Sequence, residues 1–557
     1  MRMTPKAIQI CRPVAVCLTL GASSPLLLAQ SVPDAGSLTQ QTERDRQPAA
    51  PARVAPAAPQ PQAQPSVSGE LPAQVTVKAF QFTGNTLLPA ELLQERVRPW
   101  VGQTLDLEGL KAVTAAVSDA YREGGWVVRV LLPAQDITGG TVTLQVVEAQ
   151  VGQLRLQGES RASAQQVEQT VRRAGVVPGQ PLNAGALDRG LRIASDLAGV
   201  AVSGVLGAGE KPGQTDVTLR MTPEPLLYGS VGVDNQGTRS TGPLRLQAQV
   251  GLASPLGRGE TFSLRLLHAE GLNYFSGAAQ FPLGTDGLRL GANLSWLGYR
   301  LITPEFASLA ASGSSRSAGL NLVYPLLRSA RSNVYLQGGF ERRNYDNTAN
   351  GNSTGYGVNA ASVGLSGDRV VDAGSGGITS WSATLVSADV QREATSGVAG
   401  RSTKLRYDIS HQQNLGGSFS LYGSLRGQWA DSAQDSSERF YAGGPQGVRA
   451  YPSGEGGGKD GQLLQLEARA ALPWNLTASV FYDRALLNRD PSDSPTGGSA
   501  TYQGAGVGLT WYGPKGISAT ATWARRVGSN PLPALDGRDQ DGTLRKSRVW
   551  LSLNAAF

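Results

Sequence analysis

The sequence of residues 464–470 decides the fold: Leu464-Gln465-Leu466-Glu467-Ala468-Arg469-Ala470. Aliphatic side chains alternate with polar or charged ones at every step, which is the two-residue period of a β-strand. This pattern fits a transmembrane β-barrel, in which apolar side chains face lipid and polar side chains face an aqueous interior. A soluble β-sandwich also alternates, with the opposite burial, so this strand alone leaves both folds open.

The same alternation recurs from residue 225 to the end of the chain. It predicts sixteen strands, near residues 226–234, 243–252, 260–268, 272–281, 286–297, 316–327, 332–342, 356–367, 378–390, 401–411, 417–429, 461–472, 476–485, 501–511, 515–524 and 546–557. Short connections such as 473–475 alternate with long ones such as 430–460, as the two ends of an outer-membrane barrel do. The last strand ends with Phe557 in register with apolar residues, which resembles the C-terminal sorting signal of outer-membrane proteins. This ending favours the membrane barrel over the sandwich.

The amino-acid composition argues against several classes of function. Of the 557 residues, 70 are glycine, far above the usual share of about 7%, which is typical of a strand-rich and turn-rich chain. After the N-terminal leader, no stretch approaches the ~18 apolar residues of a membrane-spanning helix. The only cysteines are Cys11 and Cys17 and the only histidines are His268 and His411, so the sequence predicts neither a thiol nor a zinc enzyme, and no cofactor. The net charge of +7 is small, and the basic residues are scattered along the chain. This distribution does not indicate nucleic-acid binding.

The N-terminal region predicts a leader followed by a linker. Residues 1–29 combine basic residues with a mostly apolar stretch and a small residue before the expected cleavage point, as a secretory signal peptide does. Residues 30–73 are rich in Pro, Ala and Gln and cannot build a core. Within them, residues 34–47 predict a short polar helix with Leu38 as its one large aliphatic residue. Such a helix would be unstable alone.

Two small units with the same order of strands and helices precede the barrel. Residues 74–149 predict a strand, two helices and two more strands, the second strand beginning at Trp126, and residues 150–223 repeat this β-α-α-β-β order. Each unit resembles a polypeptide-transport-associated (POTRA) domain, a periplasmic module of outer-membrane proteins. The resemblance is carried by Phe82-Thr83-Gly84-Asn85, Tyr121 and Gly124-Gly125-Trp126.

A strand edge beside a helix can accept an extended polypeptide as an added strand. We expect the edge that does so to comprise Val127, Val128, Arg129, Val130 and Leu131. The sequence leaves open the alternative that both units are only spacers.

The longest loop, between the eleventh and twelfth strands, contains the motif Phe440-Tyr441-Ala442-Gly443-Gly444-Pro445-Gln446-Gly447-Val448-Arg449-Ala450-Tyr451. In the thirteenth strand, the alternation directs Phe481 and Asp483 into the lumen. If the loop folds back into the barrel, Arg449 can form a bidentate, charge-assisted pair with Asp483 that lysine would reproduce poorly. The alternative from the residues alone is that Arg449 is a solvated loop residue and that Asp483 only lines the pore.

Two POTRA-like units, sixteen strands and Val448-Arg449-Ala450-Tyr451 in the loop after the eleventh strand resemble the two-partner secretion transporter family (TpsB), which includes haemolysin secretion/activation and filamentous-haemagglutinin transporters. The resemblance covers essentially the whole mature chain. It implies that the functional loop residues are Phe440, Tyr441, Gly443, Gly444, Val448, Arg449, Ala450 and Tyr451, with Phe481 and Asp483 as their luminal partners. In that family the motif usually reads Val-Arg-Gly-Tyr. Here Ala450 takes the glycine position, which would be strained if the position required a positive φ.

The resemblance also implies a function. It predicts a bacterial outer-membrane translocator whose POTRA domains lie in the periplasm, recognise an unfolded exoprotein of the haemolysin, haemagglutinin or adhesin type, and pass it through the barrel without nucleotide hydrolysis. Its partners would be that exoprotein and the lipid bilayer, with no nucleic acid; the transporter would be a monomer and not an enzyme. Residues 34–47 would form a plug helix in the resting pore.

Two alternative functions remain open from the sequence. An outer-membrane assembly insertase would usually carry more POTRA units than two. A passive solute porin has no use for periplasmic modules or for a plug segment.

Overall fold

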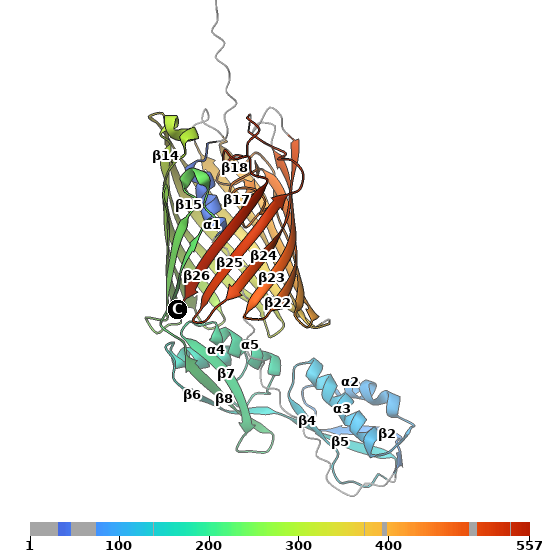
Figure 1. Cartoon of the computed structure of the whole chain (residues 1–557). Helices are drawn as coiled ribbons and strands as arrows, with labels where there is room; N and C mark the ends of the chain where they lie inside the picture. The colour runs from blue at the N-terminus through green and yellow to red at the C-terminus, as the bar shows by residue number, and fades with distance from the viewer. Residues whose placement is uncertain are drawn as a thin grey trace, which may run out of the picture.

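The computed structural model describes residues 32–45, 74–137, 139–372, 374–392, 398–489, 498–534 and 536–557. The predicted signal peptide, residues 1–29, and the linker residues 46–73 lie outside these ranges. Figure 1 shows a tall barrel that encloses the helix α1 (Ala35–Asp45), with two small α/β units beneath one rim. That rim carries the short strand connections and is therefore the periplasmic end.

Sixteen antiparallel strands close into the barrel, which confirms the predicted fold class and strand number. They are β9 (Leu227–Asp234), β10 (Arg245–Ala253), β11 (Thr261–Ala269), β12 (Leu272–Leu283), β13 (Leu288–Arg300), β14 (Ser312–Arg328), β15 (Ser332–Ala349), β16 (Asn352–Val371), β17 (Gly377–Gln391), β18 (Gly400–Gly416), β19 (Phe419–Ala430), β22 (Asp460–Leu472), β23 (Leu476–Arg489), β24 (Gly498–Tyr512), β25 (Ile517–Arg526) and β26 (Ser547–Ala556). The barrel closes where Ser230–Asp234 of β9 pair with Ser552–Ala556 of β26.

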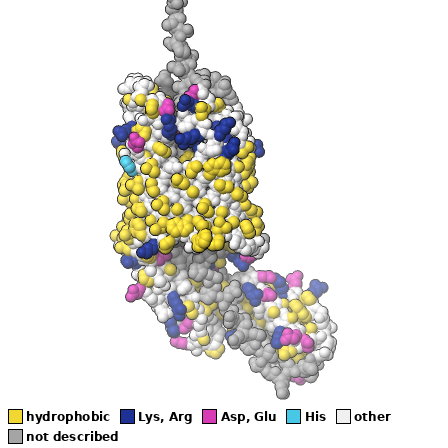
Figure 2. Space-filling model, viewed as in Figure 1, with side chains coloured by type: hydrophobic (Ala, Val, Ile, Leu, Met, Phe, Trp, Pro, Cys, Tyr) yellow, Lys and Arg dark blue, Asp and Glu magenta, His cyan; other side chains and the backbone are white. Residues whose placement is uncertain are grey.

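The barrel wall is apolar outside and polar inside, as the alternation predicts. In β23, Val480 faces outward and is 57% exposed, whereas Asp483 faces inward and has no exposed surface. Figure 2 shows the outward apolar side chains as a broad band around the barrel. A band of this extent far exceeds the apolar patches of soluble proteins, so lipid must cover it, and a soluble sandwich is excluded.

The first periplasmic unit is built from β1 (Val75–Thr76), β2 (Ala79–Thr83), α2 (Ala90–Val97), the 3-10 turn η1 (Arg98–Trp100), β3 (Thr104–Leu105), α3 (Leu107–Glu123), β4 (Val128–Leu131) and β5 (Thr141–Glu148). Helix α3 begins where the side chain of Asp106 accepts a hydrogen bond from the backbone N–H of Gly109. One face of α3 is buried, including Val113, Val117 and Tyr121, and it packs on the sheet to form the core of the unit.

The second unit contains β6 (Gln150–Gly158), α4 (Ala164–Arg173), α5 (Ala184–Ser195), β7 (Val200–Ala208) and β8 (Gln214–Pro223). The sheets are ordered β2-β5-β4 and β6-β8-β7, so the last strand is central in both units and runs parallel to the first. Gly84 and Gly158 end the first strand of each unit at φ +79° and +97°. An added Cβ would lie 2.3 and 2.2 Å from a carbonyl oxygen of the neighbouring strand, so both positions require glycine.

Contacts between the two periplasmic units, and between the second unit and the barrel, fix how these parts join, and one of them shifts the start of a predicted strand. The second strand of the first unit begins at Val128 instead of Trp126 because the backbone N–H of Val127 donates to the carbonyl of Leu182 in the second unit, at 3.1 Å. The second unit is fastened to the barrel in turn: Asp196, just after α5, accepts hydrogen bonds from Nη2 and Nε of Arg328 in β14 at 2.9 and 3.0 Å. This bidentate pair fixes the second unit against the periplasmic rim.

The helices of the described ranges are short or amphipathic, and none has the length and hydropathy to cross a membrane. Within the same ranges, no group of three or more His, Cys, Asp or Glu residues is arranged to hold a metal ion.

Candidate functional site

The loop between β19 and β22 folds back into the barrel. Phe440–Tyr441 (β20) pair with Gly457–Gly458 (β21), so the motif lies at the tip of a hairpin. Its residues Ala442, Val448 and Tyr451 are fully buried. They pack against wall residues of β22 to β25, namely Leu463, Phe481, Ala485, Leu487, Ala500, Tyr502 and Ala524. The motif is thus part of the barrel interior.

Two glycines shape the tip of this hairpin. Gly444 has a φ of +105°, and an added Cβ on Gly443 would lie 2.4 Å from the carbonyl oxygen of Pro452. The turn is closed where the backbone N–H of Val448 donates to the carbonyl of Ala442 at 2.7 Å. The path therefore requires both glycines, and it directs Arg449 toward the wall.

Arg449 is bound by two carboxylates and an aromatic ring of the barrel wall. Its Nε and Nη2 donate to the two oxygens of Asp483 at 2.9 and 2.7 Å, and its Nη1 donates to Glu467 at 2.7 Å. The guanidinium carbon lies 3.4 Å from the ring centroid of Phe481. Burial lowers the pKa of Arg449, but Asp483 and Glu467 more than offset this effect, so its pKa is raised and it stays charged.

The neighbouring backbone is held as well, and Ala450 is accommodated without strain. Trp550 in β26 donates from Nε1 to the carbonyl of Arg449 at 2.8 Å. Ala450 does not lie at positive φ. Its methyl group faces Gly504 in β24, where an added Cβ would lie only 2.7 Å from it. The absence of a side chain on the wall thus leaves room for alanine at a position where the family usually has glycine.

A second anchor holds the beginning of the loop. Glu438 is 1% exposed and forms ion pairs with the fully buried Lys404 in β18 and with Arg343 in β15. Lys404 also donates from Nζ to the backbone carbonyl of Glu438 at 2.9 Å. At this anchor the loop supplies the carboxylate and the wall supplies the cations. At the Arg449 anchor the loop supplies the cation and the wall supplies the carboxylates. The two anchors use separate strands of the wall: β15 and β18 bind Glu438, and β22 and β23 bind Arg449.

A second loop, residues 527–546 between β25 and β26, covers the end of the hairpin. Glu455 has no exposed surface and accepts hydrogen bonds from Asn530 Nδ2 at 2.7 Å and from the backbone N–H of Gln540 at 2.8 Å. Burial raises the pKa of Glu455 to about 7, and Asp539 adds to the effect. Among the residues that the structure describes, no lysine or arginine forms an ion pair with Glu455, and a carboxyl that is partly protonated at neutral pH avoids the cost of a fully charged group in such a place.

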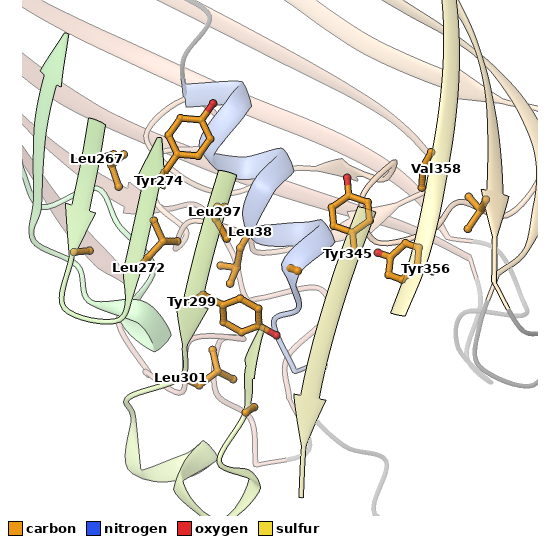
Figure 3. Packing of buried hydrophobic residues seen from close by; sticks show 14 of the residues in the cluster. Leu38, Leu267, Leu272, Tyr274, Leu297, Tyr299, Leu301, Tyr345, Tyr356 and Val358 are labelled. Carbon is orange, nitrogen blue, oxygen red and sulfur yellow. The ribbon is translucent and has the colours of Figure 1, made fainter. Parts of the chain in front are cut away.

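Helix α1 lies inside the barrel against its inner wall. Asp34 caps it by accepting from the backbone N–H of Ser37 at 2.8 Å. Leu38, which is 2% exposed, packs among apolar and aromatic side chains that line the lumen, including Leu297 and Tyr299 of β13 (Figure 3). Burial of this leucine stabilises the docked helix by about 1.5–3 kcal/mol, which supplies support that the isolated segment lacks.

Polar contacts tie α1 to both the wall and the inward loop. On the wall, the backbone N–H of Ala35 donates to Asn347 Oδ1 at 2.8 Å. On the loop, Arg44 donates from Nη1 to the carbonyl of Tyr441 at 2.7 Å and from Nη2 to that of Gly443 at 3.1 Å. Because two of these acceptors belong to the hairpin that carries Arg449, the helix and the motif support one another.

A large cavity of about 1780 Å³ occupies the lumen beside α1. Its lining includes Gln40 and Arg44 of the helix, Arg449 of the loop, and many polar side chains of the wall such as Asp408 and Ser410. The helix and the hairpin therefore occupy part of a wide polar interior.

The predicted recognition edge in the first POTRA unit is only partly available. In the sheet β2-β5-β4, β4 is an outer strand that pairs with β5 along Val128–Leu131. The prediction for Val127 is wrong, because its N–H donates to Leu182 and its carbonyl accepts from Ala149. Val127 is therefore part of the junction between the two units and cannot pair with an added strand.

Comparison with known families decides among the functions that the sequence left open. The protein-family model described as "Haemolysin secretion/activation protein ShlB/FhaC/HecB" matches residues 213–510, more than half of the chain. The chain belongs to this family. A second model, "POTRA domain, ShlB-type", matches residues 75–149 of the transporter. The transporter is thus an outer-membrane translocator of two-partner secretion with periplasmic POTRA domains, which confirms the predicted family, function and location over the porin and insertase interpretations.

Relatives of this transporter share its length and its fold. The heme/hemopexin transporter protein HuxB of Haemophilus influenzae strain 86-028NP is 25% identical over 100% of both chains. The outer membrane transporter CdiB of Escherichia coli strain 536 is 30% identical over 54% of this chain and 51% of its own. The solved structure of CdiB from Escherichia coli superposes with a TM-score of 0.74 at 23% identity, covering 93% of this chain and 97% of the other.

Several residues of the transporter's site could not be predicted from the sequence. Glu467 and Trp550, which hold Arg449, and Glu438 with Lys404, which form the second anchor, are among them. Glu467 and Lys404 lie on the inward face of their strands, a signal that marks them as luminal. Many other charged residues share that parity, so alternation alone does not indicate which of them contact the loop.

Proposed function

We propose that this transporter recognises an unfolded exoprotein of the haemolysin, haemagglutinin or adhesin type through its POTRA domains and exports it through the barrel lumen. The observation that carries the proposal is the polar cavity of about 1780 Å³, which shares the lumen with α1 and the inward hairpin. An interior of this size and polarity suits an extended chain once the helix has moved aside. We infer that α1 is the plug of the resting pore.

The Arg449 anchor fits a positioning role in this cycle. A buried pair of opposite charges holds one defined loop geometry, because a displaced partner leaves an uncompensated charge. The hairpin in turn supplies backbone carbonyls to Arg44 of the plug. We propose that the motif residues hold the hairpin in place while the plug leaves and returns.

We further propose that the transporter works as a monomer, without a cofactor and without catalysing a reaction. The closed barrel encloses its own pore within one chain. The buried charged residues of the site, Glu438, Lys404, Arg449 and Asp483, are all engaged in anchoring the loop, which supports a mechanical and not a chemical role for them.

Removal of the first POTRA unit tests where the exoprotein is recognised. We expect deletion of residues 75–148 to weaken binding of an unfolded exoprotein fragment at least tenfold, because it removes the edge strand β4, whose main-chain groups provide affinity in strand addition. Titration of the detergent-solubilised transporter with a labelled fragment measures the effect.

The control for this experiment is the barrel itself, which should keep its heat-dependent electrophoretic mobility after the deletion. A truncated transporter that binds the fragment with full affinity would show that the first unit is a spacer.

A further inference from the structure

The outer wall of β23 to β26 carries exposed basic side chains beyond the end of its apolar band. Arg484 in β23 and Arg525 in β25 face outward. Arg545 and Lys546 are also exposed and lie in the loop immediately before β26. Within the described residues, no carboxylate forms an ion pair with any of these four. Figure 2 shows basic side chains above the apolar band on this side of the barrel.

The position of the two strand arginines relative to the membrane follows from the register. Both strands run from periplasmic turns toward the outside, and Arg484 and Arg525 each come two residues after an outward aromatic residue, Tyr482 and Trp523. Aromatic residues mark the interface in barrels of this kind. Each arginine therefore lies one step outside that interface, among the headgroups of the outer leaflet.

The two arginines are close enough to share a ligand. Arg484 pairs with Gln503 of β24, and Arg525 pairs with Ala505, two residues along the same strand. Strand spacing and rise place their Cα atoms on the order of 12 Å apart. Two guanidinium groups that reach toward each other over this distance can bind one phosphate between them.

An apolar hollow lies below these arginines, on the outer face of β9, β24, β25 and β26. It has a volume of about 390 Å³, and its lining includes Leu509, Trp511, Ala519, Ala521, Leu551 and Leu553. The two alanines of β25 form its floor between larger residues of β24 and β26. Ala521 is four residues, or roughly 13 Å, from Arg525 along the strand, a distance that an acyl chain attached to a bound headgroup spans.

We propose that this surface binds a phosphorylated glycolipid of the outer leaflet, of the lipid A class. Its phosphate lies between Arg484 and Arg525, and one acyl chain occupies the hollow lined by Ala519 and Ala521. Charge complementarity selects the headgroup, since basic clusters at a membrane surface attract anionic lipids. The position at the end of the barrel remote from the POTRA domains selects the outer leaflet.

Native mass spectrometry of the full-length transporter with bis-phosphorylated lipid A tests the headgroup site. The double variant Arg484→Gln/Arg525→Gln should lower affinity roughly 25-fold, because each cation contributes about fivefold near a membrane surface. The matched control Arg98→Gln/Arg173→Gln removes two exposed arginines from the periplasmic units and should bind lipid A as the unmodified transporter does. Equal affinity of the double variant and the control would overturn the proposal.

A second variant tests the hollow without removing charge. Ala521→Leu fills the floor with a side chain suited to a lipid-facing position, so the barrel should assemble normally while lipid A affinity falls several-fold. Phosphatidylglycerol should compete poorly with lipid A for the unmodified transporter. Unchanged lipid A binding by Ala521→Leu, or equal competition by phosphatidylglycerol, would contradict a site specific for the glycolipid.

Discussion

Replacing Arg449 with alanine should reduce export of the exoprotein at least tenfold while leaving the barrel assembled in the outer membrane. The variant leaves Asp483 buried with no exposed surface and without its bidentate partner. Breaking a buried ion pair in this way costs about 3–5 kcal/mol, enough to displace the hairpin tip from the wall. The barrel should persist, because its strand pairing does not involve the loop and Glu438 still anchors the beginning of the loop.

A matched control exists on the same wall. Arg469 also faces the lumen and donates to Glu467 at 2.8 Å, yet it belongs to β22 and not to the loop. Export by Arg469→Ala should remain near normal, and Arg449→Lys should be intermediate because lysine supplies a charge without the bidentate geometry. Export is measured as secreted exoprotein relative to the amount of barrel in the membrane. Normal secretion by Arg449→Ala would eliminate the proposed positioning role.

Deletion of residues 34–47 should raise the single-channel conductance of the transporter in planar bilayers several-fold. The deletion removes α1, including the buried Leu38 and the contacts that Arg44 makes to the inward hairpin. Without the helix, ions have access to a larger cross-section of the polar lumen. Because conductance depends on that cross-section and not on the exoprotein, it reports on the plug independently of secretion.

An equally long deletion in the linker, residues 52–65, provides the control, since it shortens the connection but keeps the helix. This control should conduct as little as the full chain does. A point variant, Leu38→Asp, should give an intermediate result by placing a charge in the apolar contact around Leu297 and Tyr299. Equal current through the full chain and the chain without residues 34–47 would mean that α1 does not obstruct the pore.

The barrel could be predicted from the sequence because a strand with one face in lipid and one in water has a two-residue period at every step. The direction of Asp483 followed from the same period. The pairing of Arg449 with Asp483 required one assumption, that the loop folds inward. Once the loop does so, a buried arginine requires carboxylate partners.

Other features depend on contacts between distant parts of the chain. Glu438 and Lys404 are separated by 34 residues. The sequence around each of them does not differ from that around other charged residues of the loop or the barrel wall. The apolar contact of α1 depends on a single large aliphatic residue, Leu38, whose partners come from strands more than two hundred residues away. The loss of Val127 from the recognition edge depends on how the two POTRA units meet, a geometry that no repeat within either unit specifies.

The most direct test of export through the barrel interior is cross-linking of an exoprotein stalled during passage. Cysteines occur only at residues 11 and 17, within the predicted signal peptide, so a single introduced cysteine is unique in the mature chain. Ser410 lines the lumen cavity, whereas its neighbour Ile409 faces outward and is 47% exposed. We expect Ser410→Cys to form a cross-link to the stalled exoprotein and Ile409→Cys to form none. Cross-links at Ile409→Cys alone, or at neither position, would contradict passage through the lumen.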